Sequence, residues 1–290
     1  MNLLKLYLPF LIFFLTQCNP GNEVNDNGKN SMTQKPKERV EIKYTVISLK
    51  NENLDSFKMK YTPEQLAIIL ALNRVDENHL NRMDTIIIPD NFEVELIQYS
   101  PFPVSLPFLN EIKKMIFFSY PTQSFAVYNY GILVHWGPTN MGIKTEPTPT
   151  GIYYANWKAE ETKSTFNDEW ILKWNVNLEN KLGIGWHQYS MPGYPASHSC
   201  LRLLEADAKY LYEWVDDWEL RDKENVLIKG TPALVFGSYP FGGRKPWLSL
   251  LTDPHALDIT EQALANEVNC LPEIKKWAQK RDSFISSKTN

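Results

Sequence analysis

Short apolar segments separated by turn residues fill the stretch from Met115 to Phe236, and this pattern constrains the fold more than any other feature. Segments that alternate or run apolar over such lengths, with glycine and proline between them, are typical of β-strands. The strand-like segments are residues 116–120, 124–128, 132–136, 152–154, 170–174, 185–188 and 226–236. Before the last of them lies a helical pattern of apolar residues from Leu204 to Trp218. We therefore predict a mainly β domain with one packed helix, and residues 129–131 predict a hairpin turn.

The composition excludes several classes of protein. The chain has 290 residues, of which 43 % are hydrophobic and 13 % aromatic, so it can bury a core and is not disordered as a whole. The formal net charge of −4 gives no excess of positive charge to bind a phosphate backbone, so we expect no nucleic-acid partner. The three cysteines, Cys18, Cys200 and Cys270, are too few and too scattered for a disulfide framework. None of them has the spacing of a zinc ligand set, so we expect no metal site.

The first 18 residues have the pattern of an export signal. Lys5 precedes an apolar run from Leu6 to Leu15, which has the length of a signal-peptide core and is too short to span a bilayer. Residues 15–18 resemble a bacterial lipobox that ends at Cys18. Two alternatives stay open. Cys18 is either lipidated and becomes the mature N-terminus, or the segment is a signal peptide whose cleavage leaves a protein without a lipid anchor. Both predict export to the cell envelope or periplasm, and residues 19–39 have the composition of a flexible linker.

Residues 40–113 are predicted to form a small α+β module. Residues 63–73 have the pattern of a helix with Thr62 as its N-cap, and residues 85–89 have the pattern of a strand. A helix, a short segment and a strand ending on Ile88-Pro89 resemble the latter half of a LysM peptidoglycan-binding module. The alternative is that this helix and strand belong to the packing of the main domain.

Several motifs appear in a fixed order within residues 114–240. They are Pro147-Thr148-Pro149-Thr150-Gly151, His187 at the end of a strand, Pro192-Gly193-Tyr194-Pro195, Ser197-His198-Ser199-Cys200-Leu201-Arg202 and Gly230-Thr231-Pro232. In this order they resemble the YkuD-type L,D-transpeptidase catalytic domain. The resemblance implies a mixed, mainly β, sandwich-like fold for residues 114–240, and residues 241–290 then form a C-terminal helical extension.

Cys200 and His187 are the predicted catalytic pair. A neutral thiol is a weak nucleophile and needs a base, which the resemblance assigns to His187. The two residues are separated by thirteen positions, so the loop 188–196 must fold back, and its proline and glycine residues favour this. His198 lies two positions before Cys200 and is expected to orient the site or the substrate. We expect Arg202 to bind a substrate carboxylate and to favour the thiolate.

Other residues of the motif are predicted to support the substrate. Trp186 and Tyr194 are expected to line a groove, together with Tyr189, and Ser197 is a further supporting residue. Ser199 stands where the family has glycine, next to the backbone that would form an oxyanion hole. Cys270 is expected to be structural, and His79, His135 and His255 are expected to be surface or packing residues.

The resemblance implies an L,D-transpeptidase that acts on peptidoglycan tetrapeptide stems through a cysteine thioester, without a cofactor. It implies a role in cell wall crosslinking or remodelling, with a membrane contact through the lipid anchor. Two alternatives stay open. The same fold and nucleophile would give an L,D-carboxypeptidase or endopeptidase if water were the acceptor. In the other alternative the protein is a non-catalytic peptidoglycan-binding lipoprotein, and Cys200 has no catalytic role.

Overall fold

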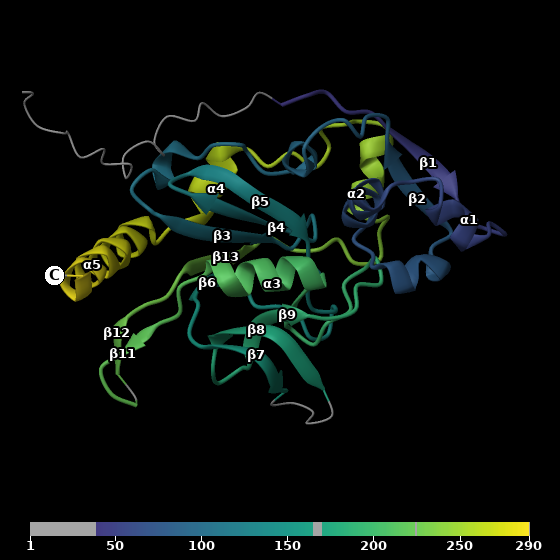
Figure 1. Ribbon diagram of the computed structural model, residues 1–290. Helices are drawn as coiled ribbons and strands as arrows, with labels where there is room; N and C mark the ends of the chain where they lie inside the picture. Colours follow the sequence, from purple (N-terminus) through teal and green to yellow (C-terminus); the bar gives the residue numbers. More distant parts are fainter. Residues whose placement is uncertain (1–38, 165–169, 224, 290) are drawn as a thin grey trace, which may run out of the picture. The chain divides into compact units, whose positions relative to one another are not determined.

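A five-stranded sheet forms the centre of the structure, with the strand order β5-β4-β3-β13-β6 (Figure 1). Its strands are β3 (Lys114–Ser119), β4 (Ser124–Asn129), β5 (Ile132–Pro138), β6 (Gly151–Tyr154) and β13 (Pro232–Phe236). Strands β3, β4 and β5 are antiparallel neighbours, whereas β13 pairs in parallel with β3. Tyr130 and Gly131 have φ angles of 47° and 75° in the turn between β4 and β5, which confirms the predicted hairpin.

This computed structural model describes residues 39–164, 170–223 and 225–289. The predicted signal peptide, Cys18 and the linker up to residue 38 lie outside the described residues. No helix in the described ranges is long and apolar enough to cross a membrane.

A second sheet of four strands lies against the first, in the order β10-β9-β8-β7. Its strands are β7 (Lys158–Lys163), β8 (Ile171–Glu179), β9 (Ile184–Gln188) and β10 (Leu201–Leu203). Strands β9 and β10 are parallel, and β7, β8 and β9 are antiparallel neighbours. The sheet brings the predicted catalytic residues onto adjacent strands. His187 lies near the end of β9, and Cys200 directly precedes β10.

The main core lies between the two sheets and helix α3 (Glu205–Trp214). It is formed by large apolar side chains of both sheets and of the helix, among them Phe118, Phe125, Val176, Trp186, Leu203 and Leu211. In Figure 1, α3 runs along the space between β3–β5 and β7–β9. The predicted helix is confirmed, but it ends at Trp214 because Val215 already has an extended backbone. The predicted mainly β fold with helices is also confirmed.

The C-terminal residues cover the other face of the five-stranded sheet. Leu264, Val268 and Ile274 pack against β-strand residues such as Phe117 and Phe236. Leu264 lies in helix α4 (Glu261–Glu267), Val268 is the C-cap of α4, and Ile274 lies in α5 (Leu271–Thr289). The 3₁₀ helix η4 (Pro246–Leu251) precedes these helices. A short pair of strands, β11 (Glu219–Leu220) and β12 (Val226–Ile228), follows α3.

The N-terminal part has the element order β-α-α-β. Its elements are β1 (Tyr44–Ser48), α1 (Leu54–Lys58), α2 (Pro63–Asn73), the 3₁₀ helix η1 (Glu77–Arg82) and β2 (Thr85–Pro89). β1 and β2 pair antiparallel, and Thr62 caps α2 by accepting a hydrogen bond from the Gln65 N–H at 3.2 Å. The predicted helix 63–73 and strand 85–89 are thus confirmed. The 3₁₀ helices η2 (Leu96–Tyr99) and η3 (Pro107–Leu109) then lead into β3.

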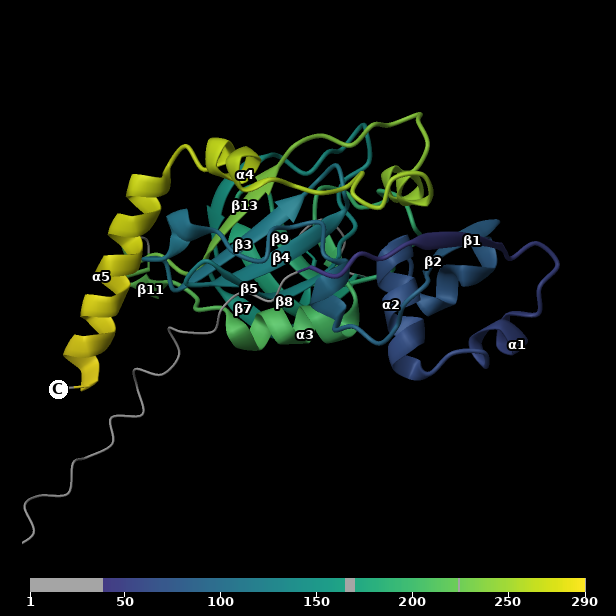
Figure 2. The same cartoon turned by 90° about the horizontal axis from the view of Figure 1, so that it is seen from above.

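Helix α2 also packs against the rest of the chain. Leu72 of α2, Trp136 of β5 and Trp247 of η4 share one buried cluster. Both views place α5 far from α1 and the β1–β2 pair (Figure 2). The N-terminal elements therefore pack against β5 and η4, on the side of the molecule away from α5.

Candidate active site

Strands β9 and β10 position the predicted catalytic residues. Arg202 lies directly opposite His187 in the parallel pairing, so both belong to the same row across the two strands. One cavity of about 30 Å³ is lined by His187, Cys200 and Arg202, together with Ser164, Trp170, Leu172, Tyr189, Ser197 and His198. The structure thus brings His187 together with the segment 197–202, although the loop 188–196 separates them in the sequence.

The His187 imidazole is a neutral base with a fixed tautomer. Its side chain is buried, and burial lowers its pKa to about 4, further lowered by the positive charge of Arg202. Nδ1 lies 2.9 Å from the carbonyl oxygen of Gln188, which can only accept a hydrogen bond. Nδ1 therefore carries the proton, and Nε2 keeps a free lone pair at neutral pH.

The Cys200 thiol is half-buried and neutral. Burial raises its pKa, while the backbone N–H of Gly185 and the charge of Arg202 act in the opposite direction. Sγ lies 3.8 Å from the carbonyl oxygen of Gly183, to which the thiol donates. Among the described residues no hydrogen bond joins Cys200 to His187. The free site therefore holds a thiol and an imidazole, and not a thiolate–imidazolium pair.

Arg202 is a cation without a carboxylate partner in the described part of the chain. Its guanidinium stacks over the Tyr189 ring, with Cζ at 4.5 Å from the ring centroid. One nitrogen, Nη1, donates to the carbonyl oxygen of Ser190 at 3.3 Å. Tyr189 also makes an edge contact with His187, at 5.8 Å between ring centroids. The guanidinium can still take a carboxylate, since its charge is not neutralised.

The turn before Cys200 is held by hydrogen bonds to the segment 141–143. The Ser197 N–H donates to the Met141 carbonyl at 3.1 Å. The Ser197 hydroxyl donates to the Cys200 carbonyl at 2.5 Å. Ser199 has a φ of 74°, in the left-handed region that favours glycine. The backbone N–H groups of Ser199 and Cys200 make no hydrogen bond with the described part of the chain. They can therefore receive a developing oxyanion.

His198 is half-exposed at the rim of the cavity. Its Nδ1 forms an ion-pair contact with a Glu146 carboxylate oxygen, and its ring stacks near Trp170 at 5.6 Å between centroids. Sequence reasoning missed Glu146, which lies directly before the Pro147-Thr148-Pro149 motif. The structure therefore gives His198 a partner of its own, Glu146, while His198 and His187 both line the same cavity.

The expectation that Trp186 lines the groove is wrong. Side chains alternate along a strand, so Trp186 and His187 point to opposite faces of β9. The Trp186 side chain is 0 % exposed and packs on Phe118 in the core, with 5.7 Å between ring centroids. Tyr194 is 49 % exposed and does not belong to the residues that line the cavity.

Asp76 holds the loop 188–196, and sequence reasoning missed it. Its Oδ2 accepts a hydrogen bond from the Met191 N–H at 2.6 Å, and its own N–H donates to the Met191 carbonyl at 2.8 Å. Beside it, Val75 forms an isolated antiparallel bridge with Pro192. The segment after α2 therefore fixes the loop that connects His187 to Ser197.

A second cavity of about 70 Å³ is also lined by Cys200. It is lined by Gly183, Gly185 and polar side chains of β8 and its turn, namely Asn175, Asn177 and Asn180, together with Trp157, Thr162, Lys163, Ser164 and Leu172. Cys200, Ser164 and Leu172 belong to both cavities. Cys200 thus lies where two cavities meet.

The remaining cysteine and histidines lie elsewhere. Cys270 packs beside the second core cluster. His79 contacts Asp76 at 2.6 Å, His135 contacts the buried Asp207 at 2.8 Å, and His255 contacts Asp258 at 2.9 Å. Within the described residues, no group of three or more His, Cys, Asp or Glu side chains could hold a metal ion.

Comparison with solved structures gives L,D-transpeptidases with low identity. The matches include an enzyme from Stackebrandtia nassauensis, at 22 % identity over 44 % of this chain and 57 % of that one, with a TM-score of 0.36. An L,D-transpeptidase from Mycobacterium smegmatis matches at 19 % identity, over 43 % and 59 %, with a TM-score of 0.34. One from Enterococcus faecium matches at 20 % identity, over 43 % and 50 %, with a TM-score of 0.34. The chain thus spans less than two thirds of each, and the comparison with curated proteins found no match.

Comparison with protein families gives a direct match. Residues 113–235 match the model of the YkuD family, described as the L,D-transpeptidase catalytic domain. The matched residues include both strands of the site, the loop between them and the segment 147–151. Residues 113–235 of this chain therefore resemble the L,D-transpeptidase catalytic domain of the YkuD family.

Proposed function

We propose that this protein is a cysteine-dependent L,D-transpeptidase that acts on the tetrapeptide stems of peptidoglycan. One arrangement carries the proposal: a neutral His187, the Cys200 thiol and the unpaired Arg202 line one cavity. A base, a nucleophile and a cation are the three groups that acyl transfer from a peptide with a free carboxylate requires.

The first step transfers the acyl group to the enzyme. Arg202 binds the terminal carboxylate of the donor stem, and this holds the scissile carbonyl over Cys200. Nε2 of His187 takes the thiol proton as Sγ forms a bond to the carbonyl carbon. The oxyanion is stabilised by the N–H groups of Ser199 and Cys200, each worth about 3–4 kcal/mol by analogy with measured oxyanion holes. The C–N bond then breaks, and the leaving amine receives the proton from His187.

The second step releases the acyl group. The side-chain amine of a second stem attacks the thioester carbon and loses a proton to His187, and Cys200 leaves as the thiol after reprotonation. The cavities of about 30 and 70 Å³ hold only a few atoms each, so most of either stem must lie outside them. The presence of Cys200 in the lining of both cavities supports separate approach of donor and acceptor.

The N-terminal residues determine where the reaction takes place. We propose export to the cell envelope, with Cys18 as a lipid anchor to the membrane and residues 19–39 as a linker. We also propose that residues 44–89 bind peptidoglycan, the substrate of the catalytic domain. Their β-α-α-β order supports this. No cofactor is required by this mechanism.

Disaccharide-tetrapeptides incubated with the purified protein test the proposal. We expect a crosslinked dimer that has lost one terminal residue, detected by mass spectrometry. Cys200→Ala should abolish the product, whereas the matched change Cys270→Ala should leave it unchanged. Tripeptide alone would instead identify a carboxypeptidase. The catalytic proposal is wrong if the wild type gives neither product and Cys200→Ala binds peptidoglycan equally well.

A further inference from the structure

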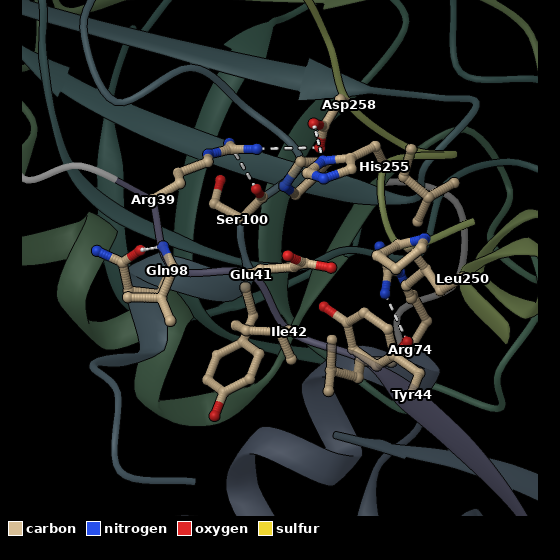
Figure 3. Close-up of a pocket in the computed structure, with 16 residues that line it drawn as sticks. Arg39, Glu41, Ile42, Tyr44, Arg74, Gln98, Ser100, Leu250, His255 and Asp258 are labelled. Atoms are coloured by element: carbon tan, nitrogen blue, oxygen red, sulfur yellow. Dashed lines mark hydrogen bonds and ion pairs between the residues drawn. The ribbon is translucent and has the colours of Figure 1, made fainter. Parts of the chain in front are cut away.

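A cavity of about 250 Å³ lies far from the catalytic residues in the sequence and shares no residue with the catalytic cavities. It is enclosed by residues 39–44, the C-terminal end of α2, residues 98–101 and residues 250–258 (Figure 3). Ile42, Leu72, Leu250 and Leu257 supply apolar walls. A water molecule occupies about 30 Å³ in the liquid, so the cavity is large enough for a small organic molecule.

Arg74 is a buried cation at this cavity. Its side chain is only 2 % exposed, and it follows α2 with a left-handed φ of 53°. Nε donates to the Thr122 carbonyl at 2.9 Å and Nη1 to the Leu72 carbonyl at 2.5 Å. Burial lowers its pKa to about 10, so the group stays charged at neutral pH. Its Cζ also lies 5.2 Å from the centroid of the Trp247 ring. No carboxylate pairs with it in the described part of the chain, so these contacts offset the desolvation of its charge without neutralising it.

The other charged groups around the cavity are already paired, with one exception. Arg39 donates to Asp258 at 3.0 Å, and His255 contacts the other oxygen of the same carboxylate at 2.9 Å. Glu41 makes no ion pair with any described residue, and Figure 3 shows its carboxylate pointing into the cavity. Among the described residues, the buried Arg74 pairs with no carboxylate and the exposed Glu41 forms no ion pair, with Arg74 or with any other cation.

The Tyr44 hydroxyl points into the same space (Figure 3). Burial raises the pKa of Tyr44 to about 12, so the hydroxyl stays protonated and can donate a hydrogen bond. Nη2 of Arg74 makes no hydrogen bond with the described residues, so Tyr44 and Nη2 can offer two donors to one anion. A dianion such as phosphate is disfavoured, because the Glu41 carboxylate lines the same cavity.

We infer that this cavity binds a small zwitterion, an amino acid or short peptide, with its carboxylate on Arg74 and Tyr44 and its ammonium group on Glu41. Such a ligand would place an anion against the buried Arg74 and a cation against the exposed Glu41 at the same time. Its side chain contacts the apolar walls formed by Ile42 and Leu250. The site does not depend on the catalytic reaction proposed above.

Calorimetric titration of the full chain with alanine and alanyl-alanine tests the inference. Acetate and methylammonium serve as probes that carry only one of the two charges. We expect saturable binding of at least one zwitterion, and weaker binding of acetate. Glu41→Gln should raise the Kd of the zwitterion about tenfold or more without affecting acetate, because it removes one charge-assisted contact. Tyr44→Phe should weaken both.

Arg202→Gln is the matched control, because Arg202 is the unpaired arginine of the catalytic cavity. Binding should survive Arg202→Gln and be lost in Arg74→Gln. Where Arg74→Gln does not fold, Glu41→Gln and Tyr44→Phe decide the question. The inference is overturned if no zwitterion binds, if Glu41→Gln leaves its Kd unchanged, or if binding disappears in Arg202→Gln.

Discussion

Protonation of His187 should destabilise the fold at acid pH by an amount that the structure sets. A histidine in the unfolded chain has a pKa of about 6.5, whereas burial lowers the pKa of His187 to about 4. Between these values the unfolded state binds more protons than the folded state, so stability rises with pH. The contribution is complete above pH 6.5 and is lost as the pH falls toward 4. At pH 4 the loss reaches about 3 kcal/mol, since each pKa unit corresponds to about 1.4 kcal/mol.

Urea unfolding of the wild type and His187→Gln at pH 7 and pH 4 measures this loss. Glutamine has no titrating ring and can still donate a hydrogen bond to the Gln188 carbonyl. Carboxylates that destabilise the fold in acid act on both proteins and cancel in the difference. We expect the wild type to lose about 3 kcal/mol more than the variant between the two pH values. Equal losses, or an NMR titration of the His187 ring with a midpoint near 6.5, would refute the reasoning.

Substitutions at three further positions test other parts of the site. Ser199→Gly should fold at least as stably as the wild type, whereas Ser199→Val should lose about 1–2 kcal/mol in thermal unfolding, because φ is 74°. Asp76→Ala should destabilise the protein by about 1–3 kcal/mol and lower kcat/KM, because the Met191 N–H loses its acceptor; unchanged kinetics would contradict this. Arg202→Gln should raise KM for the tetrapeptide about tenfold, and the acid limb of its kcat/KM profile should move to higher pH because His187 loses a positive neighbour. An unmoved acid limb would show that this charge does not reach the imidazole.

The parts of the fold with strong local patterns could be predicted from the sequence. The hairpin β4–β5 and helix α3 combine turn residues with a clear apolar period, and the structure confirms both. Strand β10 was missed because its three residues are too short to establish an alternation. Strand β7 was missed because only Ala159 in it is apolar and its side chains are largely accessible.

The site could be predicted only where the motif itself carries the residues. Cys200, His187 and Arg202 lie within the motif, and the structure brings them to one cavity. The role assigned to Trp186 ignored the alternation of side chains along its own strand. Asp76 lies 115 residues from its partner Met191 and Glu146 lies 52 from His198, and such distant contacts leave no local pattern.

The bonds between residues 75–76 and 191–192 also bear on how this protein evolves. A recombination that replaced residues 40–113 by an unrelated module would remove both the Val75 bridge and the Asp76 acceptor. The loop between His187 and Ser197 would then lose its support in the same event. We therefore expect residues 40–113 and the loop to be inherited together, and substitutions at positions 76 and 191 to co-vary among relatives that keep both.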